Sequence, residues 1–314
     1  MAVINTEKAD LYANVETVTV DSFAEALNLE VSYKGRGYLT LNSVSVSRPG
    51  LQLAGYFKHF DHNRVQLIGN AEHEYLLSMN DKDRSLVLSE FFKRDVPCVI
   101  FANNLHVLPS VTEYAKKYNC PILKSKQITT VLAHELTMYQ EDLLAPTKII
   151  HGVFVEVFGV GVLITGNAGI GKSETALELI TRGHRLIADD SVIVKNKGDL
   201  LMGKSPDNIR YYMEVRGIGI INVQTMYGPG SIRPEKTVDI IVELQRWQDG
   251  KEYERLGDVK ITSEILGIEK PTLIIPVSPG RNIPVIIETA ARKYRLDQTG
   301  YDATQELISR TFKK

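Results

Sequence analysis

The segment Gly166–Ser173 has the residue types and the spacing of a phosphate-binding loop. A glycine, four further residues and then Gly-Lys-Ser follow one another, which is the pattern of the P-loop. The glycines allow backbone N–H groups to turn inward around an anion, Lys172 would reach the terminal phosphates, and the Ser173 hydroxyl is a candidate magnesium ligand. The predicted nucleotide-binding residues are therefore Gly166, Asn167, Ala168, Gly169, Ile170, Gly171, Lys172 and Ser173.

The sequence around this loop has the order that a P-loop needs. The apolar residues Gly161–Thr165 predict a strand before it, and apolar positions 176, 177, 179 and 180 predict a helix after it that ends at Gly183. The glycines at 166, 169 and 171 do not fit the G-x-G-x-x-G order of a dinucleotide-binding fold. We therefore favour a P-loop over a dinucleotide site or a plain glycine-rich turn.

Two consecutive carboxylates, Asp189 and Asp190, end the apolar run that begins at Leu186. A strand would carry both to the carboxyl edge of a sheet, beside the phosphate loop. There, one carboxylate would hold magnesium indirectly and the other would accept a proton from an attacking hydroxyl. The alternative is an Asp-Asp-Ser turn without a catalytic role.

Three further segments contain candidates whose chemistry the residues leave open. The segment Glu214-Val-Arg216-Gly217 suits metal binding and a close approach of phosphate, or else a surface ion pair at the start of a strand. His151 precedes the strand of the phosphate loop and is either an active-site imidazole or a structural histidine. Arg281 follows a strand in a turn-rich loop, where it would bind a phosphate or belong to a surface turn.

The elements that must position these residues change in character along the chain. Residues 1 to about 130 alternate helical patterns with short apolar runs, which predicts an N-terminal α/β domain (1–130) of unclear role. Apolar residues recur every three or four positions over Val131–Leu144, which predicts a linker helix. A second domain, 131–314, would contain this helix, a sheet and two C-terminal helices, Thr289–Arg295 and Ala303–Phe312. Its predicted strands cover 153–165, 186–194, 217–223, 238–244 and 272–277.

Length and composition argue against several classes of protein. The 314 residues suggest two domains, and 43% hydrophobic with 24% charged residues is typical of a globular chain. The 37 basic and 38 acidic residues give a net charge of −1, which argues against nucleic-acid binding. The longest apolar stretch is too short to span a membrane, and the first residues lack the apolar region of a secretory signal. We therefore expect a cytoplasmic protein without nucleic-acid or membrane partners.

Taken together, the motifs resemble the bacterial HPr kinase/phosphorylase family over most of the chain. The similarity rests on the phosphate loop and on Arg48–Gly55, His151-Gly152, Asp189-Asp190, Glu214–Val223 and Pro276–Asn282. The resemblance implies a bifunctional enzyme that uses ATP or pyrophosphate to phosphorylate a serine of the protein HPr. It also implies the reverse phosphorolysis, which releases pyrophosphate, and a role in regulating carbon catabolite repression and sugar uptake.

The same resemblance implies roles for individual residues. Lys172 would bind phosphate, Ser173 and Glu214 would hold Mg²⁺, and Asp190 would accept the proton in the forward reaction and donate it in reverse. The other implied active-site positions are Asp189, which would assist Asp190, and His151, Arg216, Gly217, Arg255 and Arg281, the last in a segment tied to dephosphorylation. The family is hexameric, and its P-loop kinase domain resembles phosphoenolpyruvate carboxykinases rather than eukaryotic protein kinases.

Two other functions stay open from the residues alone. A small-molecule kinase would need a concave substrate pocket in place of a protein-docking face. A nucleotide-sensing regulator would bind ATP at the loop to switch partner binding, and Asp190 would then be merely structural.

Overall fold

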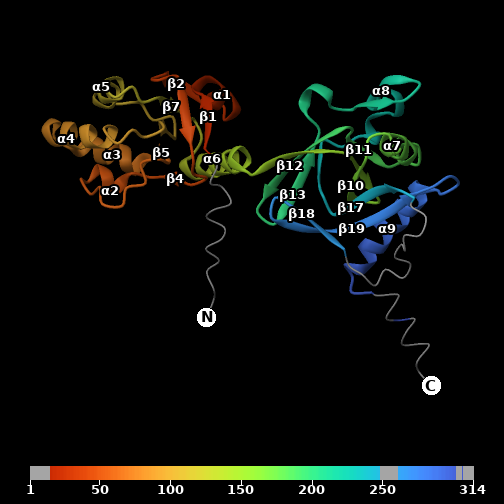
Figure 1. The fold of residues 1–314 in the computed structure, drawn as a ribbon. Coiled ribbons are helices and arrows are strands. Elements are labelled where there is room, and N and C mark those ends of the chain that lie inside the picture. Colours follow the sequence, from red (N-terminus) through yellow and green to blue (C-terminus); the bar gives the residue numbers. More distant parts are fainter. Residues whose placement is uncertain (1–14, 248–260, 302–305, 307–314) are drawn as a thin grey trace. The chain divides into compact units, whose positions relative to one another are not determined.

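The computed structural model describes residues 15–247, 261–301 and 306 (Figure 1). The chain forms two compact units, 1–146 and 147–314. The boundary thus falls after Pro146, whereas the sequence pattern placed it near residue 130. Arg255 and the second C-terminal helix expected over Ala303–Phe312 lie outside the described residues. Within the described part, no helix has both the length and the apolar character to cross a bilayer.

The first unit is an α/β domain, as the sequence predicted. Four parallel strands and one antiparallel edge strand form a sheet in the order β2-β7-β6-β5-β4, and β1 pairs with β3 separately. In chain order the elements are β1 (Glu16–Thr19), α1 (Val20–Ala26), β2 (Glu30–Tyr33), β3 (Tyr38–Leu41), β4 (Val46–Ser47), α2 (Gly50–Leu53), β5 (Val65–Ile68), α3 (Asn70–Ser78), α4 (Asp81–Phe92), β6 (Val99–Phe101), α5 (Pro109–Lys117), β7 (Ile122–Lys124) and α6 (Thr129–Leu144).

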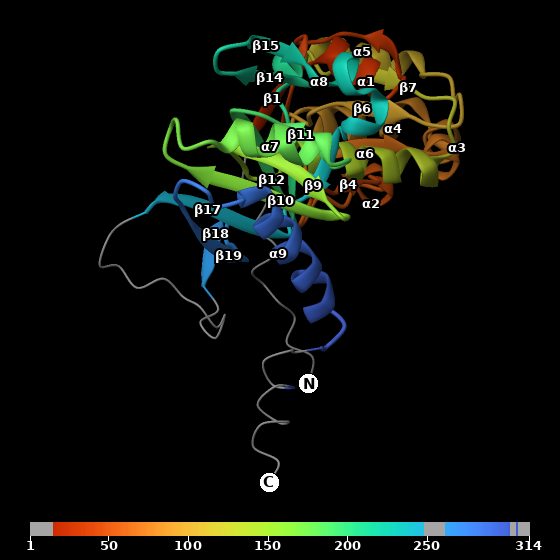
Figure 2. The same cartoon turned by 90° about the vertical axis from the view of Figure 1, so that its right-hand side faces the viewer.

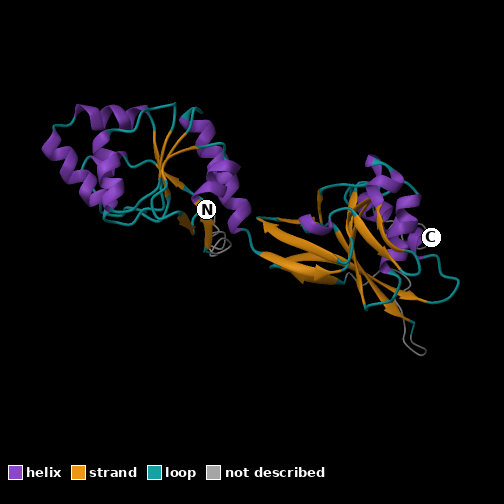
Figure 3. Ribbon diagram, turned by 90° about the horizontal axis from the view of Figure 1, so that it is seen from above, coloured by secondary structure: helices purple, strands orange, loops and turns teal. Residues whose placement is uncertain are grey.

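The central strands of this sheet are buried on both faces, and Figure 3 shows helices on either side of them. On β6, Ile100 packs with Phe23 of α1 and Leu136 of α6. Its neighbour Phe101 packs on the opposite face with Leu88 of α4. Strands covered on both faces have nearly continuous apolar sequences. The helix predicted as a linker, α6, therefore contributes to the core of the first unit.

The second unit contains two sheets. A six-stranded sheet has the order β11-β9-β10-β17-β19-β18, a four-stranded antiparallel sheet has the order β16-β13-β12-β8, and β14 and β15 form a separate hairpin. In chain order the elements are β8 (Thr147–His151), β9 (Val153–Val157), β10 (Val160–Gly166), α7 (Lys172–Thr181), β11 (Arg185–Ala188), β12 (Ser191–Lys197), β13 (Leu200–Lys204), η2 (Asp207–Ile209), β14 (Tyr212–Val215), β15 (Gly219–Asn222), α8 (Val223–Tyr227), η3 (Pro229–Ser231), β16 (Glu235–Thr237), β17 (Ile240–Arg246), β18 (Thr262–Ile265), β19 (Ile268–Val277) and α9 (Ile283–Asp297).

The six-stranded sheet is covered by helices on one face and by the four-stranded sheet on the other. Ile164 of β10 packs in one core with Ala176 of α7 and Ile287 of α9, and Figure 2 shows these two helices near each other. The adjacent Leu163 packs in the second core with Val192 of β12. Because successive side chains of a strand point to opposite faces, β10 contributes to both cores. The strand that leads into the phosphate loop is therefore fixed from both sides.

Three predicted elements have different limits in the structure. The run 153–165 folds back on itself at Phe158 and Gly159, both with positive φ, to form the β9–β10 hairpin. The run 186–194 is divided between β11 of the larger sheet and β12 of the smaller one. The helix predicted over Thr289–Arg295 begins earlier, at Ile283, because the side chain of Asn282 accepts a hydrogen bond from the Val285 N–H and caps it.

Candidate functional site

The phosphate loop connects the end of β10 to the start of α7, as its sequence predicted. Gly166, Gly169 and Gly171 have φ angles of 135°, 76° and 102°, a region that residues with a Cβ rarely adopt. Gly166 also passes close to the neighbouring strand β17, where a Cβ would lie 2.4 Å from the backbone oxygen of Leu244. Position 166 thus requires glycine both for its backbone conformation and for the space beside β17.

Lys172 is the first residue of α7 and is only 7% exposed. Its Nζ donates hydrogen bonds to the backbone oxygens of Gly166 at 2.9 Å and Asn167 at 3.1 Å. These bonds fold the side chain back over the loop. The positive charge is therefore held above the backbone groups that the glycines turn inward.

Asp189 follows β11 and is bound from two other elements. The Ser173 hydroxyl donates to its Oδ1 at 2.8 Å, and the Glu214 backbone N–H donates to its Oδ2 at 3.2 Å. Burial, with 5% of the residue exposed, raises the pKa of the Asp189 carboxyl. The two hydrogen bonds oppose this rise and the nearby charge of Asp190 adds to it. Asp189 therefore joins the phosphate loop to the β14–β15 hairpin.

Asp190 presents its carboxylate to solvent beside His151. Its φ of 63° marks the turn at which the chain leaves one sheet for the other. His151 Nδ1 lies 2.9 Å from the backbone oxygen of Asp190 and 3.1 Å from its Oδ1. The Asp190 side chain is 72% exposed. A carboxylate that is both positioned and accessible is suited to accept a proton from a bound substrate.

The β14–β15 hairpin brings Glu214 and Arg216 to the same place. Gly217 and Gly219 have positive φ angles of 83° and 103°, which allow the chain to reverse between the two strands. The Arg216 guanidinium lies against Gly169 of the phosphate loop, where a Cβ would be 3.0 Å from its Nη1. The small size of Gly169 therefore leaves room for this arginine.

These groups line one cavity of about 140 Å³. Its oxygen-bearing side chains, on Ser173, Glu174, Asp189, Asp190 and Glu214, are of the type that Mg²⁺ prefers. Its cationic side chains, on Lys172 and Arg216, are of the type that neutralises phosphate oxygens, and Asp190 beside His151 is a candidate proton acceptor. The lining residues are His151, Val153, Ala168, Gly169, Gly171, Lys172, Ser173, Glu174, Asp189, Asp190, Glu214 and Arg216.

Comparison with known proteins decides the family. The family described as "HPr Serine kinase N terminus" matches residues 18–139, and "HPr Serine kinase C-terminal domain" matches residues 142–311. The chain is 41% identical to the HPr kinase/phosphorylase of Peptoclostridium acidaminophilum over 95% of this chain and 97% of that protein. It belongs to the HPr kinase/phosphorylase family. The resemblance found in its motifs is thereby confirmed.

The chain is also similar to another protein named HPr kinase/phosphorylase and, over part of its length, to a solved structure. The protein from Alkaliphilus metalliredigens is 43% identical over 95% of this chain and 97% of its own length. A solved structure, "Structure of the Hpr(Ser) kinase/phosphatase from Coxiella burnetii", is 37% identical and covers 51% of this chain and 98% of that chain, with a TM-score of 0.47.

Not all the residues predicted for an HPr kinase/phosphorylase site lie together. Gly217 forms the hairpin turn and is not among the residues that line the cavity. Arg281 lines a separate depression beside α7, and Arg255 lies outside the described residues. Glu174, which the sequence analysis did not single out, borders both hollows. Its position directly after Ser173 was the signal that could have found it.

Proposed function

We propose that this chain transfers a phosphoryl group to and from a serine of the protein HPr. The observation that carries the proposal is one cavity that contains the P-loop lysine, the candidate Mg²⁺ ligands Ser173 and Glu214, and the exposed Asp190 carboxylate. Relatives that are 41% to 43% identical over almost the whole chain have the name HPr kinase/phosphorylase. The donor in the forward direction would be ATP or pyrophosphate.

Ser173 and Glu214 would hold Mg²⁺ in this cavity. Both present oxygen to it, and Asp189 supports them because it accepts from the Ser173 hydroxyl and from the Glu214 backbone. When bound, the ion would neutralise charge on the phosphate oxygens of the donor. The side chains of Lys172 and Arg216 would add further positive charge beside the donor phosphates.

Asp190 would be the proton acceptor. In the forward reaction a new bond forms between the serine oxygen and the transferred phosphorus, the bond to the leaving ADP or phosphate breaks, and the serine proton passes to Asp190. In phosphorolysis, an oxygen of inorganic phosphate attacks the phosphoserine phosphorus. The seryl oxygen leaves with the proton from Asp190, and pyrophosphate is released. His151 would keep the carboxylate oriented, because its Nδ1 contacts both the backbone oxygen and the Oδ1 of Asp190.

The finer properties rest on the resemblance alone. It supports a homohexamer, a catalytic domain of the phosphoenolpyruvate carboxykinase type and further roles for Gly217, Arg255 and Arg281. We also propose a cytoplasmic enzyme, without nucleic-acid or membrane partners, that acts in carbon catabolite repression and sugar uptake.

The deciding experiment follows labelled phosphate through both reactions. The purified chain is incubated with HPr, Mg²⁺ and ATP labelled in its γ-phosphate, and inorganic phosphate is then added. We expect label on a serine of HPr and its later release as pyrophosphate. Binding of ATP without label on HPr would overturn the proposal, and would favour a small-molecule kinase or a nucleotide-sensing regulator.

A further inference from the structure

A second depression adjoins the phosphate loop. It has a volume of about 440 Å³ and shares Gly171 and Glu174 with the cavity that contains Lys172. One wall is formed by the loop and α7, including Ile170 and Glu178. The other wall is the segment that follows β19, which includes Arg281. The two hollows are therefore neighbours on either side of one short stretch of backbone.

The sizes of the two hollows differ in a way that matters for ATP. The first, at about 140 Å³, lies below the roughly 300–1,000 Å³ that is typical of small-molecule sites, and the second, at about 440 Å³, lies within that range. A pyrophosphate needs only the phosphate loop and its cations. A nucleoside triphosphate also needs a place for its base and ribose.

The lining of the second depression suits such a group. Ile170, Val277 and Ile283 supply apolar surface for a flat base. Thr175 and Asn282 supply polar atoms beside that surface, which is the usual composition of a site that fixes the orientation of a small ligand.

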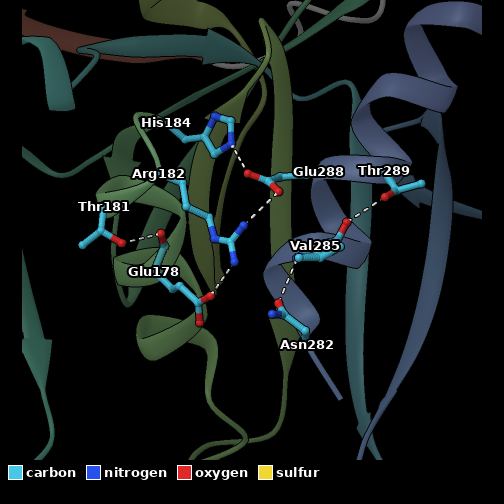
Figure 4. Close-up of polar contacts among 8 residues, drawn as sticks. All are labelled: Glu178, Thr181, Arg182, His184, Asn282, Val285, Glu288 and Thr289. Atoms are coloured by element: carbon cyan, nitrogen blue, oxygen red, sulfur yellow. Dashed lines mark hydrogen bonds and ion pairs between the residues drawn. The ribbon is translucent and has the colours of Figure 1, made fainter. Parts of the chain in front are cut away.

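Polar contacts between α7 and α9 hold the two walls in place (Figure 4). Arg182 donates to Glu178 Oε1 at 3.0 Å and to Glu288 Oε2 at 3.3 Å, and so joins the two helices. His184 Nε2 lies 3.0 Å from Glu288 Oε1. A site with fixed walls loses less conformational entropy on binding than one that must first become ordered.

We propose that this depression binds the nucleoside of the ATP donor. The base and ribose would lie between Ile170 and Val277, and the triphosphate would pass Gly171 to reach Lys172. This inference rests on the proposed function and adds the place of the nucleoside to it. It also separates the two donors, because pyrophosphate has no nucleoside and leaves the depression unused.

The test fills the depression from an exposed position. Glu178→Trp places a large ring at its edge and removes the ion pair with Arg182. Arg182→Ala, the matched control, removes the same ion pair together with the contact to Glu288, and it leaves the depression open. We expect Glu178→Trp to raise KM for ATP by about tenfold or more, because the new ring occupies space that the nucleoside needs; tenfold corresponds to about 1.4 kcal/mol of binding. Pyrophosphate-driven phosphorylation of HPr should stay unchanged. Arg182→Ala should raise KM for ATP less than Glu178→Trp does, because it removes contacts between the walls but places nothing in the depression, and it should leave pyrophosphate-driven phosphorylation unchanged. An equal loss with both donors, or an unchanged KM for ATP, would overturn the proposal.

A binding measurement makes the outcome independent of HPr. Calorimetry compares ATP with inorganic tripolyphosphate, which has the same phosphate chain but no nucleoside. The wild type should bind ATP more tightly, and Glu178→Trp should abolish that preference. Equal binding of both by the wild type would overturn the nucleoside site. If ATP is preferred but neither donor phosphorylates HPr, the proposed function fails and the nucleoside site stands.

Discussion

Ser173 Oγ donates a hydrogen bond of 2.8 Å to Asp189 Oδ1, and this bond joins the first turn of α7 to the end of β11. The hydroxyl uses its only proton in this contact, so its oxygen lone pairs remain for a cation. The second carboxylate oxygen accepts from the Glu214 backbone N–H. The geometry of the predicted metal ligands thus depends on Asp189, although the resemblance gave this residue only an assisting role.

Asp189→Asn is expected to stabilise the folded chain at neutral pH. Burial raises the pKa of Asp189 above its ordinary value of 3.8, so ionisation is less favourable in the folded chain than in the unfolded one. For an acid with a raised pKa, the stabilising contribution is complete below the ordinary value and is lost as pH rises through the folded-state pKa. Asparagine avoids the cost of a buried charge, and it can keep both contacts if its amide oxygen accepts from the Glu214 N–H and its amide nitrogen donates to the Ser173 oxygen, which can also accept. The melting temperature should be measured for both proteins at pH values from about 4 to 7.5. We expect that of the variant to exceed that of the wild type at neutral pH, and the difference to decrease as the pH is lowered.

The same substitution is expected to lower activity. An amide at 189 lacks the negative charge that supports a cation beside Ser173, so transfer to HPr should fall by about tenfold or more. Stability gained at the expense of activity is common where a site contains a destabilising charge. A variant with a lower melting temperature than the wild type at pH 7 would show that the buried charge is compensated by its two hydrogen bonds.

Asp190→Ala is expected to abolish both directions of transfer and to spare ATP binding. Its carboxylate is exposed and contacts His151 rather than the phosphate loop. Loss of a general base typically slows a reaction by about 10²–10⁴-fold. Rates of HPr phosphorylation and of phosphorolysis are measured alongside ATP affinity by calorimetry. Turnover at the wild-type rate would refute the assignment of Asp190 as the base and would favour the nucleotide-sensing regulator.

The strand, loop and helix around Lys172 could be predicted from the sequence, because residues that are neighbours in the chain determine this part of the site. The division at Asp189 and Asp190 could not be predicted, because β11 and β12 are both apolar and only their assignment to different sheets shows where the chain turns. That turn places Asp190 beside His151 of β8, a contact between residues 39 apart in the chain.

The place of the arginines also depends on tertiary structure. Arg216 reaches the phosphate loop because the β14–β15 hairpin folds over it, whereas Arg281 lies at the second depression. Both arginines lie near glycines in turn-forming segments, and the sequence gives no distance between either of them and Lys172. The same limit applies to the domain boundary, since the periodic pattern of α6 does not show that its apolar face packs into the first unit.

Gly169→Ala is expected to reduce phosphoryl transfer through a clash with Arg216. The new Cβ would lie 3.0 Å from Nη1, and the backbone has a φ of 76°. Gly159→Ala is the matched control, because its φ is 84° but nothing lies within 4 Å of the added Cβ. Both variants have the strain of a left-handed alanine, about 1–2 kcal/mol. Only Gly169→Ala should lower the rate of HPr phosphorylation, and similar rates in the two variants would argue against a role for the Arg216 contact.

Gly203→Ala is expected to destabilise the second unit by overpacking the space between its two sheets. The added Cβ would lie 2.6 Å from Cε1 of Phe154, whose ring is fully buried. Such overpacking typically costs about 1–3 kcal/mol. Phe154→Leu, although it removes buried surface by itself, makes room for the alanine. The double variant should therefore be more stable than the sum of the single changes predicts, with a coupling of about 0.5–3 kcal/mol in a denaturant-unfolding cycle. If the two changes in the free energy of unfolding were strictly additive, the two positions would not share this space, because only substitutions at independent sites have additive effects.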